Sequence, residues 1–305
     1  MIPVLDWQRF AAGNDRDGFI ADLGRACRET GFFLLTGHGV PQKLVDDLFT
    51  VGDALFALPD AIKAKTDIKS NTGNRGWAAF GSENLDESSD QVDRKEAFNI
   101  GLDLAADDPR VLAAEPFRSA NQWPDLPGFR QTCLGYYDAV LELGVDMHRA
   151  IALDLGLDEE YFTAAFDAPM ATLRLLHYPA SSTGIGAGAH TDYGSITLLM
   201  TDGEPGLQVK PRGGDWTDVP HVKGAFIVNI ADCLMRWTND IYVSTPHRVL
   251  PPRRKRRSLA FFLDPNPDAV IAALPGTGAA RYPPVTGADY LRSRLDATYN
   301  VRPTS

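Results

Sequence analysis

Apolar positions recur with the spacing of α-helices in several parts of the chain. In the segment 15–30, Phe19, Ile20, Leu23 and Cys27 fall on one face of a helix, and Gly31 follows where helices commonly end. The same periodicity, together with proline and glycine at the boundaries, predicts helices over 15–30, 41–58, 128–155, 159–166 and 288–299.

Short apolar runs separated by glycine, proline and small polar residues predict β-strands, most of them in the second half of the chain. These runs are 2–5, 32–35, 97–100, 173–178, 195–201, 206–210, 225–230, 247–250 and 258–263. Residues 70–125 are otherwise rich in Gly, Asn, Asp and Ser, which predicts loops of the kind that form lids or binding sites.

These patterns predict an α+β fold in which helices of the first half support a β-rich second half. Several short strands between turns favour a sandwich or barrel, and we expect a jelly roll with helical support. No repeat or low-complexity linker divides the chain, so residues 1–305 are expected to form one domain. Within it, residues 1–170 are mainly helical support and lid, 171–270 the jelly-roll core, and 271–305 a C-terminal segment and helix.

Composition and charge narrow the class of function. The 305 residues carry a formal net charge of −10, so we expect neither nucleic acid nor an anionic membrane as the main partner. Three cysteines without a CxxC pair suit a reducing compartment. The chain shows no signal peptide and no apolar run of the roughly 18 residues that a membrane helix needs. We therefore expect a cytoplasmic protein that acts on a small molecule; a monomer is compatible with this surface, and the oligomeric state stays open.

Two histidines and an aspartate have the surroundings of metal ligands. His190 and Asp192 are two residues apart, so on an extended segment their side chains share a face, about 7 Å apart along the backbone. His247 stands later in the chain, where a β-run begins. Two imidazoles and one carboxylate form the facial triad that holds Fe(II) and leaves positions open for substrate and O₂. Because a His-x-Asp pair is also common as a hydrogen-bonded strand end, a second signal is needed.

The second signal is a basic run followed by a strand. Alone, the run 253–257 is typical of a solvated turn or a polyanion patch. Arg256 and Ser258, however, are two residues apart on an extended segment and share a face. A guanidinium binds a carboxylate through two parallel hydrogen bonds and a hydroxyl donates one more, so the pair is predicted to receive the distal end of a dicarboxylate. The other register, Arg257 with Leu259, offers no hydroxyl.

With both signals in place, the sequence resembles the isopenicillin N synthase-like iron(II)/2-oxoglutarate dioxygenases. The resemblance rests on His190-Thr191-Asp192, His247-Arg248-Val249, Arg256-Arg257-Ser258 and the segments 30–40, 173–179, 229–230 and 261–266. It spans nearly the whole chain and implies a distorted double-stranded β-helix, or jelly roll, with iron at one mouth.

The resemblance also implies the chemistry. Fe(II) is bound by the triad, 2-oxoglutarate chelates it as cosubstrate, and O₂ is used to hydroxylate, desaturate or cyclise a small organic molecule with release of succinate and CO₂. The distal carboxylate of 2-oxoglutarate meets Arg256, Ser258 and, by position, Tyr178, whose other interpretation is a packed strand tyrosine. The chain departs from many relatives at Leu176, where Asn is common, and at Ala231, where Gly is common.

Basic and aromatic residues of the first half are candidates for the substrate pocket. By the resemblance, Arg75, Trp77, Phe80 and Lys95 are expected near the pocket mouth, and Arg174 on the barrel wall. The hypothesis is a substrate with an apolar body and one anionic group, met by Arg75 or Lys95. The alternatives are basic side chains that face solvent, aromatic rings that belong to the core, and an outward-pointing Arg174.

Three other functions share parts of this pattern. A same-fold iron oxidase that does not use 2-oxoglutarate also carries Arg-x-Ser, and oxygen uptake with and without 2-oxoglutarate distinguishes the two. A non-catalytic, metal-dependent ligand-binding protein would keep a full triad for no chemistry. An oxygenase of nucleic acids would bind them through 253–257, but the net charge of −10 and the lack of a second basic patch count against it.

Overall fold

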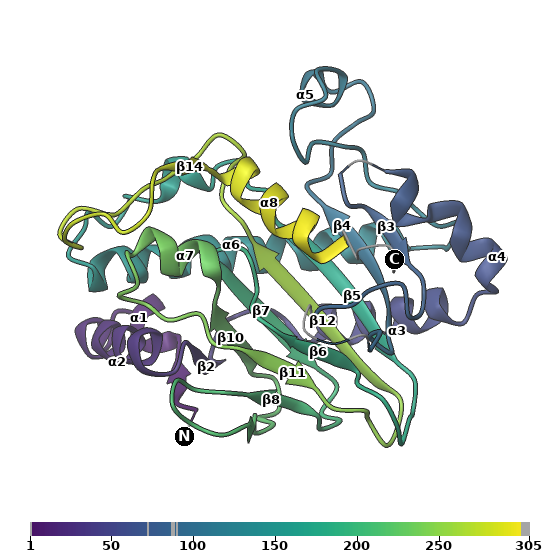
Figure 1. Ribbon diagram of the computed structural model, residues 1–305, viewed down its shortest axis with the longest axis horizontal. Helices are drawn as coiled ribbons and strands as arrows, with labels where there is room; N and C mark the ends of the chain where they lie inside the picture. The colour runs from purple at the N-terminus through teal and green to yellow at the C-terminus, as the bar shows by residue number, and fades with distance from the viewer. Residues whose placement is uncertain (1, 72, 87–88, 90, 300–305) are drawn as a thin grey trace.

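The computed structural model describes residues 2–71, 73–86, 89 and 91–299 (Figure 1). Its strands are β1 (Val4–Asp6), β2 (Phe32–Thr36), β3 (Gly76–Ala78), β4 (Glu96–Gly101), β5 (Thr172–Tyr178), β6 (Ala187–His190), β7 (Ile196–Thr201), β8 (Leu207–Val209), β9 (Thr217–Asp218), β10 (Phe226–Ile230), β11 (His247–Val249), β12 (Arg256–Leu263), β13 (Val270–Ile271) and β14 (Val285–Thr286). Its α-helices are α1 (Gln8–Ala11), α2 (Arg16–Glu29), α3 (Gln42–Phe56), α4 (Asp60–Lys63), α5 (Pro109–Leu112), α6 (Phe129–Asp154), α7 (Asp232–Trp237) and α8 (Gly287–Tyr299). Short 3₁₀ helices are η1 (Ala64–Thr66), η2 (Ile68–Ser70) and η3 (Thr163–Ala165).

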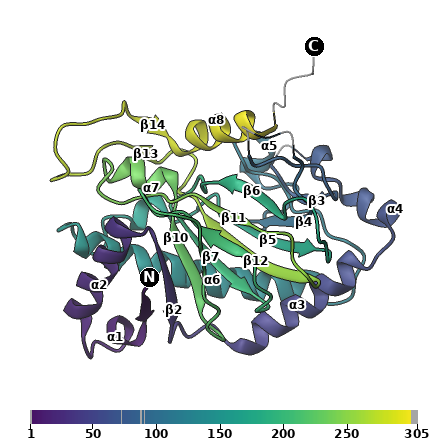
Figure 2. The ribbon, with the colours of Figure 1, turned by 60° about the horizontal axis from the view of Figure 1, so that its bottom comes forward.

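Two facing sheets form the centre of the molecule. The larger has the strand order β1-β2-β10-β7-β12-β5-β4-β3, and the smaller has the order β6-β11-β8-β9. Their pairings are antiparallel except that of β1 with β2. Figure 2 shows the smaller sheet on one face of the larger and helices α3 and α6 on the other. The predicted α+β class, a jelly roll with helical support, is confirmed.

Alternation of side chains along the strands separates a core from an internal cavity. On β12, Leu259, Phe261 and Leu263 belong to the apolar cluster that packs against the helices. Ala260 belongs to a second cluster between the two sheets, and Ser258 lines the cavity there. Because successive side chains point to opposite faces, each strand contributes one row to the core and one to the cavity.

Most predicted elements are present with ends shifted by one or two residues, but the helix predicted over 159–166 is wrong. That segment holds only η3. The side chain of Asp158 accepts a hydrogen bond from the backbone N–H of Glu160, and Asn266 donates to the backbone oxygen of Ala164. The first of these bonds is local and competes with helix formation, and the second ties the segment to a distant part of the chain. The pattern also misses β3 and β6, which are only 3 and 4 residues long.

Strands from both halves of the chain share the larger sheet. β1 and β2 extend it beside β10, and β3 and β4 extend it beside β5. Residues 1–170 therefore contribute strands to the larger sheet as well as the helices that were predicted for them. Among the described residues, no helix combines the length and apolar character needed to cross a bilayer.

Candidate metal centre

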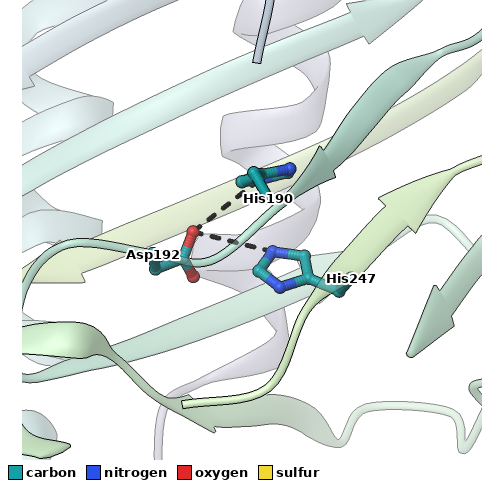
Figure 3. A group of neighbouring side chains, drawn as sticks. All are labelled: His190, Asp192 and His247. Carbon is teal, nitrogen blue, oxygen red and sulfur yellow. Dashed lines mark ion pairs between the residues drawn. The ribbon is translucent and has the colours of Figure 1, made fainter. Parts of the chain in front are cut away.

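His190, Asp192 and His247 come together in the cavity between the two sheets (Figure 3). His190 is the last residue of β6 and His247 the first of β11, and the two are paired across the strands. Asp192 lies in the loop after β6 rather than on an extended strand. The loop turns its carboxylate back towards both imidazoles, so the three predicted ligands converge.

The distances between these side chains suit a single metal ion. Oδ1 of Asp192 is 3.8 Å from Nε2 of His190 and 3.6 Å from Nε2 of His247. One ligand atom from each residue lies within 4.8 Å of the others. Ligand bonds of about 2 Å place neighbouring ligands of one ion about 3 Å apart, so binding requires only small adjustments.

Hydrogen bonds fix the orientation of both imidazoles. Nδ1 of His190 is 2.7 Å from the backbone oxygen of Gly188, and Nδ1 of His247 is 3.3 Å from that of Thr245. A carbonyl oxygen only accepts, so each Nδ1 carries the hydrogen and each Nε2 presents its lone pair to the side of Asp192. Burial and the neighbouring imidazole lower the pKa of His190, which keeps the ring neutral, as metal binding requires.

The two oxygens of Asp192 have different surroundings. Oδ2 accepts hydrogen bonds from Oγ1 of Thr197 at 2.6 Å and Nδ2 of Asn229 at 2.8 Å. Burial raises the pKa of Asp192, but the imidazoles and these hydrogen bonds outweigh it, and the pKa lies below its ordinary value. Neither Thr197 nor Asn229 is among the site residues that the sequence predicts, although Asn229 lies in a segment that carries the family resemblance. A polar residue inside the apolar run of β10 was the available signal for Asn229.

The predicted carboxylate receptor lies in the same cavity. Arg256 and Ser258 share the inner face of β12, and Tyr178 stands opposite Arg256 on β5. Nη1 of Arg256 is 3.4 Å from Oγ of Ser258, and its guanidinium lies 5.0 Å from the centre of the Tyr178 ring. Arg256 is 1% exposed, and no carboxylate of the described residues forms an ion pair with it. An anionic ligand would complete such a site.

Lys95 and Arg174 also line the cavity, but buried carboxylates neutralise both. Oε2 of Glu83 is 2.5 Å from Nη2 of Arg174 and 3.2 Å from Nζ of Lys95, and Lys95 also pairs with Asp93. Burial raises the pKa of Glu83, but the two cations outweigh it and hold the pKa well below its ordinary value. Asp93 in turn accepts a hydrogen bond from the backbone N–H of Gly188, on the strand that carries the first histidine.

Arg75 is the third predicted basic residue that the structure places on the cavity wall, and it is buried rather than solvent-facing. Apolar side chains form much of the remaining wall. They include Phe32, Leu85, Phe117, Met170, Leu176, Leu199, Leu207, Val249, Phe262, Leu291 and Leu295.

The structure does not bring Trp77 and Phe80 to the cavity. The indole Nε1 of Trp77 donates to Oε2 of Glu96 at 2.9 Å, and its ring belongs to the core beneath the helices. Because side chains alternate along β3, it is Ala78 that belongs to the apolar cluster between the sheets. Phe80 is 48% exposed, with the guanidinium of Arg94 over its ring.

Two models of known protein families match separate parts of the chain. Residues 169–265 match the model described as the 2OG-Fe(II) oxygenase superfamily. Residues 2–126 match the model described as non-haem dioxygenase in morphine synthesis N-terminal. The first of these matches contains the triad and the three residues of the carboxylate receptor.

Individual proteins match over nearly the full chain. The sequence is 36% identical over 315 residues to the 2-oxoglutarate-Fe(II) type oxidoreductase hxnY of Emericella nidulans, covering 97% of this chain and 90% of that protein. It is 33% identical to clavatol oxidase claD of Penicillium crustosum, covering 98% of this chain and 95% of that one. The crystal structure of a full-length Neurospora crassa protein in complex with alpha-KG and thymine is similar with a TM-score of 0.85 at 32% identity, covering 97% of this chain and 96% of that chain.

Proposed function

This chain belongs to the 2OG-Fe(II) oxygenase superfamily, and on that premise we propose which of its residues bind the metal, the cosubstrate and the substrate. The protein is an iron(II)- and 2-oxoglutarate-dependent oxygenase. When bound, Fe(II) and 2-oxoglutarate enable O₂ to oxidise a C–H bond of a small organic molecule, with release of succinate and CO₂.

His190, Asp192 and His247 bind the Fe(II) in this proposal. The observation that carries it is that the two carboxylate oxygens of Asp192 have different neighbours. Oδ2 is held by Thr197 and Asn229, and Oδ1 is turned towards Nε2 of both histidines. Because two imidazoles and one carboxylate would occupy three coordination positions, an ion held there would keep positions free for ligands in the cavity that these residues line. The protein holds the ligands rigid and the imidazole of His190 neutral before the metal arrives.

Arg256, Ser258 and Tyr178 bind the distal carboxylate of 2-oxoglutarate. Support comes from the burial of Arg256 without a counter-ion among the described residues, from the hydroxyl of Ser258 beside it and from the Tyr178 ring that lies against its guanidinium. The guanidinium offsets the charge of the carboxylate and fixes its direction through paired hydrogen bonds. The cosubstrate is thereby oriented with its other end towards the triad.

The primary substrate is a small organic molecule with an apolar body, and hydroxylation is the expected outcome. Support comes from the apolar side chains that form much of the cavity wall. The Neurospora crassa protein, whose crystal structure holds thymine, is an example of a protein of this fold that accepts a small organic molecule. These side chains exclude water from the cavity and orient one C–H bond of the substrate towards the metal.

Anaerobic titration with Fe(II) and then 2-oxoglutarate, followed by visible absorption and calorimetry, tests the assignment. We expect His190→Ala to lose Fe(II) binding. Arg256→Gln should bind Fe(II) normally but weaken 2-oxoglutarate about ten- to hundred-fold, because it loses hydrogen bonds between charged groups.

Arg257→Gln is the matched control for the cosubstrate site. Arg257 is the next residue on β12, but it faces outward and pairs with Asp53 and Asp202. Equal affinity for 2-oxoglutarate in the Arg256 and Arg257 variants would contradict the assignment. Oxygen uptake that does not depend on 2-oxoglutarate would instead favour the same-fold oxidase.

A further inference from the structure

The cavity contains a second buried guanidinium that, like that of Arg256, has no carboxylate partner among the described residues. Arg75 is 3% exposed. Its Nη1 is 3.3 Å from Oγ1 of Thr172 and 3.5 Å from the backbone oxygen of Asn74, and its Nε has no hydrogen-bond partner. Burial of an uncompensated charge is costly, so a fold that keeps one on a cavity wall is adapted to an anionic ligand.

None of the other charged side chains on the cavity wall forms an ion pair with Arg75 in the described part of the chain. Lys95 and Arg174 are already paired with Glu83. Asp264 lines the cavity, but no ion pair joins it to Arg75 in the described part of the chain. Burial and the charge of Asp192 raise the pKa of Asp264 to about 7, although the charge of Arg75 opposes this rise. Burial lowers the pKa of Arg75 to about 10, which still leaves a cation at neutral pH.

The backbone makes room for this guanidinium. A Cβ at Gly101, the last residue of β4, would overlap with it. Gly101 pairs with Thr172 on β5, and Thr172 pairs with Phe262 on β12. Arg75 thus lies at the Phe262 end of β12, whereas Arg256 begins that strand. The six-residue separation corresponds to about 20 Å along the strand.

The metal site lies nearer the Arg75 end of this cavity. Thr197, which holds Oδ2 of Asp192, pairs with Phe262 in the sheet. The cosubstrate carboxylate site at Arg256 lies at the far end of the same strand. An anion held by Arg75 therefore belongs to the molecule on the other side of the metal, which is the primary substrate.

We propose that Arg75 binds a carboxylate of the primary substrate, which is a small monocarboxylic acid with an apolar body. The inference rests on the proposed function, because it uses the same cavity and the same metal. The planar guanidinium matches a carboxylate through two parallel hydrogen bonds, and the hydroxyl of Thr172 lies beside it. Apolar wall residues such as Phe117, Met170 and Leu291 are available to the body of the acid.

Paired acids and amides test this directly. Protein loaded anaerobically with Fe(II) and saturating 2-oxoglutarate is titrated calorimetrically with benzoate and benzamide, phenylacetate and phenylacetamide, and indole-3-acetate and indole-3-acetamide. We expect at least one acid to bind about ten-fold or more tightly than its amide, since hydrogen bonds between charged groups are the stronger ones. Arg75→Gln should abolish that preference.

Arg118→Gln is the matched control. Arg118 is also buried, but it donates to the backbone oxygens of Pro169 and Ala168 and is not among the residues that line the cavity. The preference for the acid should persist in this variant. If no acid binds better than its amide, or if Arg75→Gln keeps the preference, the proposal is wrong.

Loading with Fe(II) and 2-oxoglutarate distinguishes a failure of the proposed function from a failure of the Arg75 assignment. Saturating 2-oxoglutarate keeps the Arg256 site occupied, so a preference for the acid cannot arise there. If 2-oxoglutarate fails to bind the Fe(II) protein, both the proposed function and this inference are overturned. If loading succeeds and the acids show no preference, only the inference on Arg75 is overturned.

A measurement without ligand gives an independent readout. Arg75→Met should raise the melting temperature of the free protein, because it removes an uncompensated buried charge. Arg174→Met should lower it, because Glu83 then loses its ion pair with Arg174. A loss of stability in Arg75→Met as large as that in Arg174→Met would indicate a structural role for Arg75 and contradict the proposal.

Discussion

The hydroxyl of Thr197 holds one oxygen of Asp192 and so orients the other towards the metal. Thr197→Val keeps the shape of the side chain but removes that hydrogen bond, leaving Oδ2 with Asn229 alone. Loss of a group that supports a metal ligand typically weakens metal binding about ten- to hundred-fold, and we expect this loss in Fe(II) affinity, measured by anaerobic calorimetry.

Thr201→Val provides the control for this prediction. Thr201 lies on the same face of β7, four residues further on, and pairs with Ser258. It contributes no hydrogen bond to the triad among the described residues. Unchanged Fe(II) affinity in Thr197→Val, or an equal loss in Thr201→Val, would show that the hydroxyl does not position Asp192.

Glu83 links stability to pH at the residue scale. Its pKa in the folded protein is held below the ordinary value by Arg174 and Lys95, despite burial. At pH values above the ordinary pKa of the unfolded chain, the full stabilisation is present. As the pH falls below it, the unfolded chain takes up a proton that folded Glu83 does not, so this stabilisation is lost towards acid.

We therefore expect Glu83→Gln to lose about 3 kcal/mol of unfolding free energy at neutral pH, because it breaks the buried ion pairs of Glu83 with Arg174 and Lys95. The variant should also lose less stability than the wild type between neutral and acidic pH. Urea unfolding at a series of pH values measures both effects. Glu142→Gln, an exposed acid on α6, should change neither; parallel pH curves for the wild type and Glu83→Gln would refute the role of Glu83.

At the scale of elements, the sequence predicts best what depends on neighbours in the chain. The pair Arg256 and Ser258 shares a face simply because strand side chains alternate, and β12 has this alternation over its full length. The face of Trp77 could not be predicted in the same way, because β3 has 3 residues and its register depends on pairing with β4. Such short strands show no periodicity of their own.

The neutralisation of cavity cations depends on contacts distant in the sequence. Arg174 on β5 pairs with Glu83, which lies in the long loop between β3 and β4. Nothing in the pattern of that loop predicts which cation its carboxylates meet. The sequence could therefore predict Arg75, Lys95 and Arg174 as candidates for the substrate pocket. It could not distinguish which of them lacks a carboxylate partner among the described residues.

At the scale of the whole molecule, most residues of the basic run 253–257 are buried or form ion pairs within the protein. Arg256 is buried on the cavity wall. Lys255 and Arg257 both pair with Asp53, on α3, and Arg257 also pairs with Asp202. Three of the five basic residues in the run are therefore buried or neutralised, which leaves Arg253 and Arg254 exposed.

Because the molecule has a net charge of −10, we predict that two exposed arginines are too few to form a site for a polyanion. Binding to nucleic acid depends on several cations that together neutralise several phosphates, and long-range repulsion by an acidic surface opposes it. We expect the full chain to bind neither a labelled DNA duplex nor a single strand at low salt, as measured by fluorescence anisotropy. Binding that weakens with salt and disappears in an R253E/R254E double variant would contradict this prediction. It would also make the run a functional surface, because Arg253 and Arg254 have no part in the cavity.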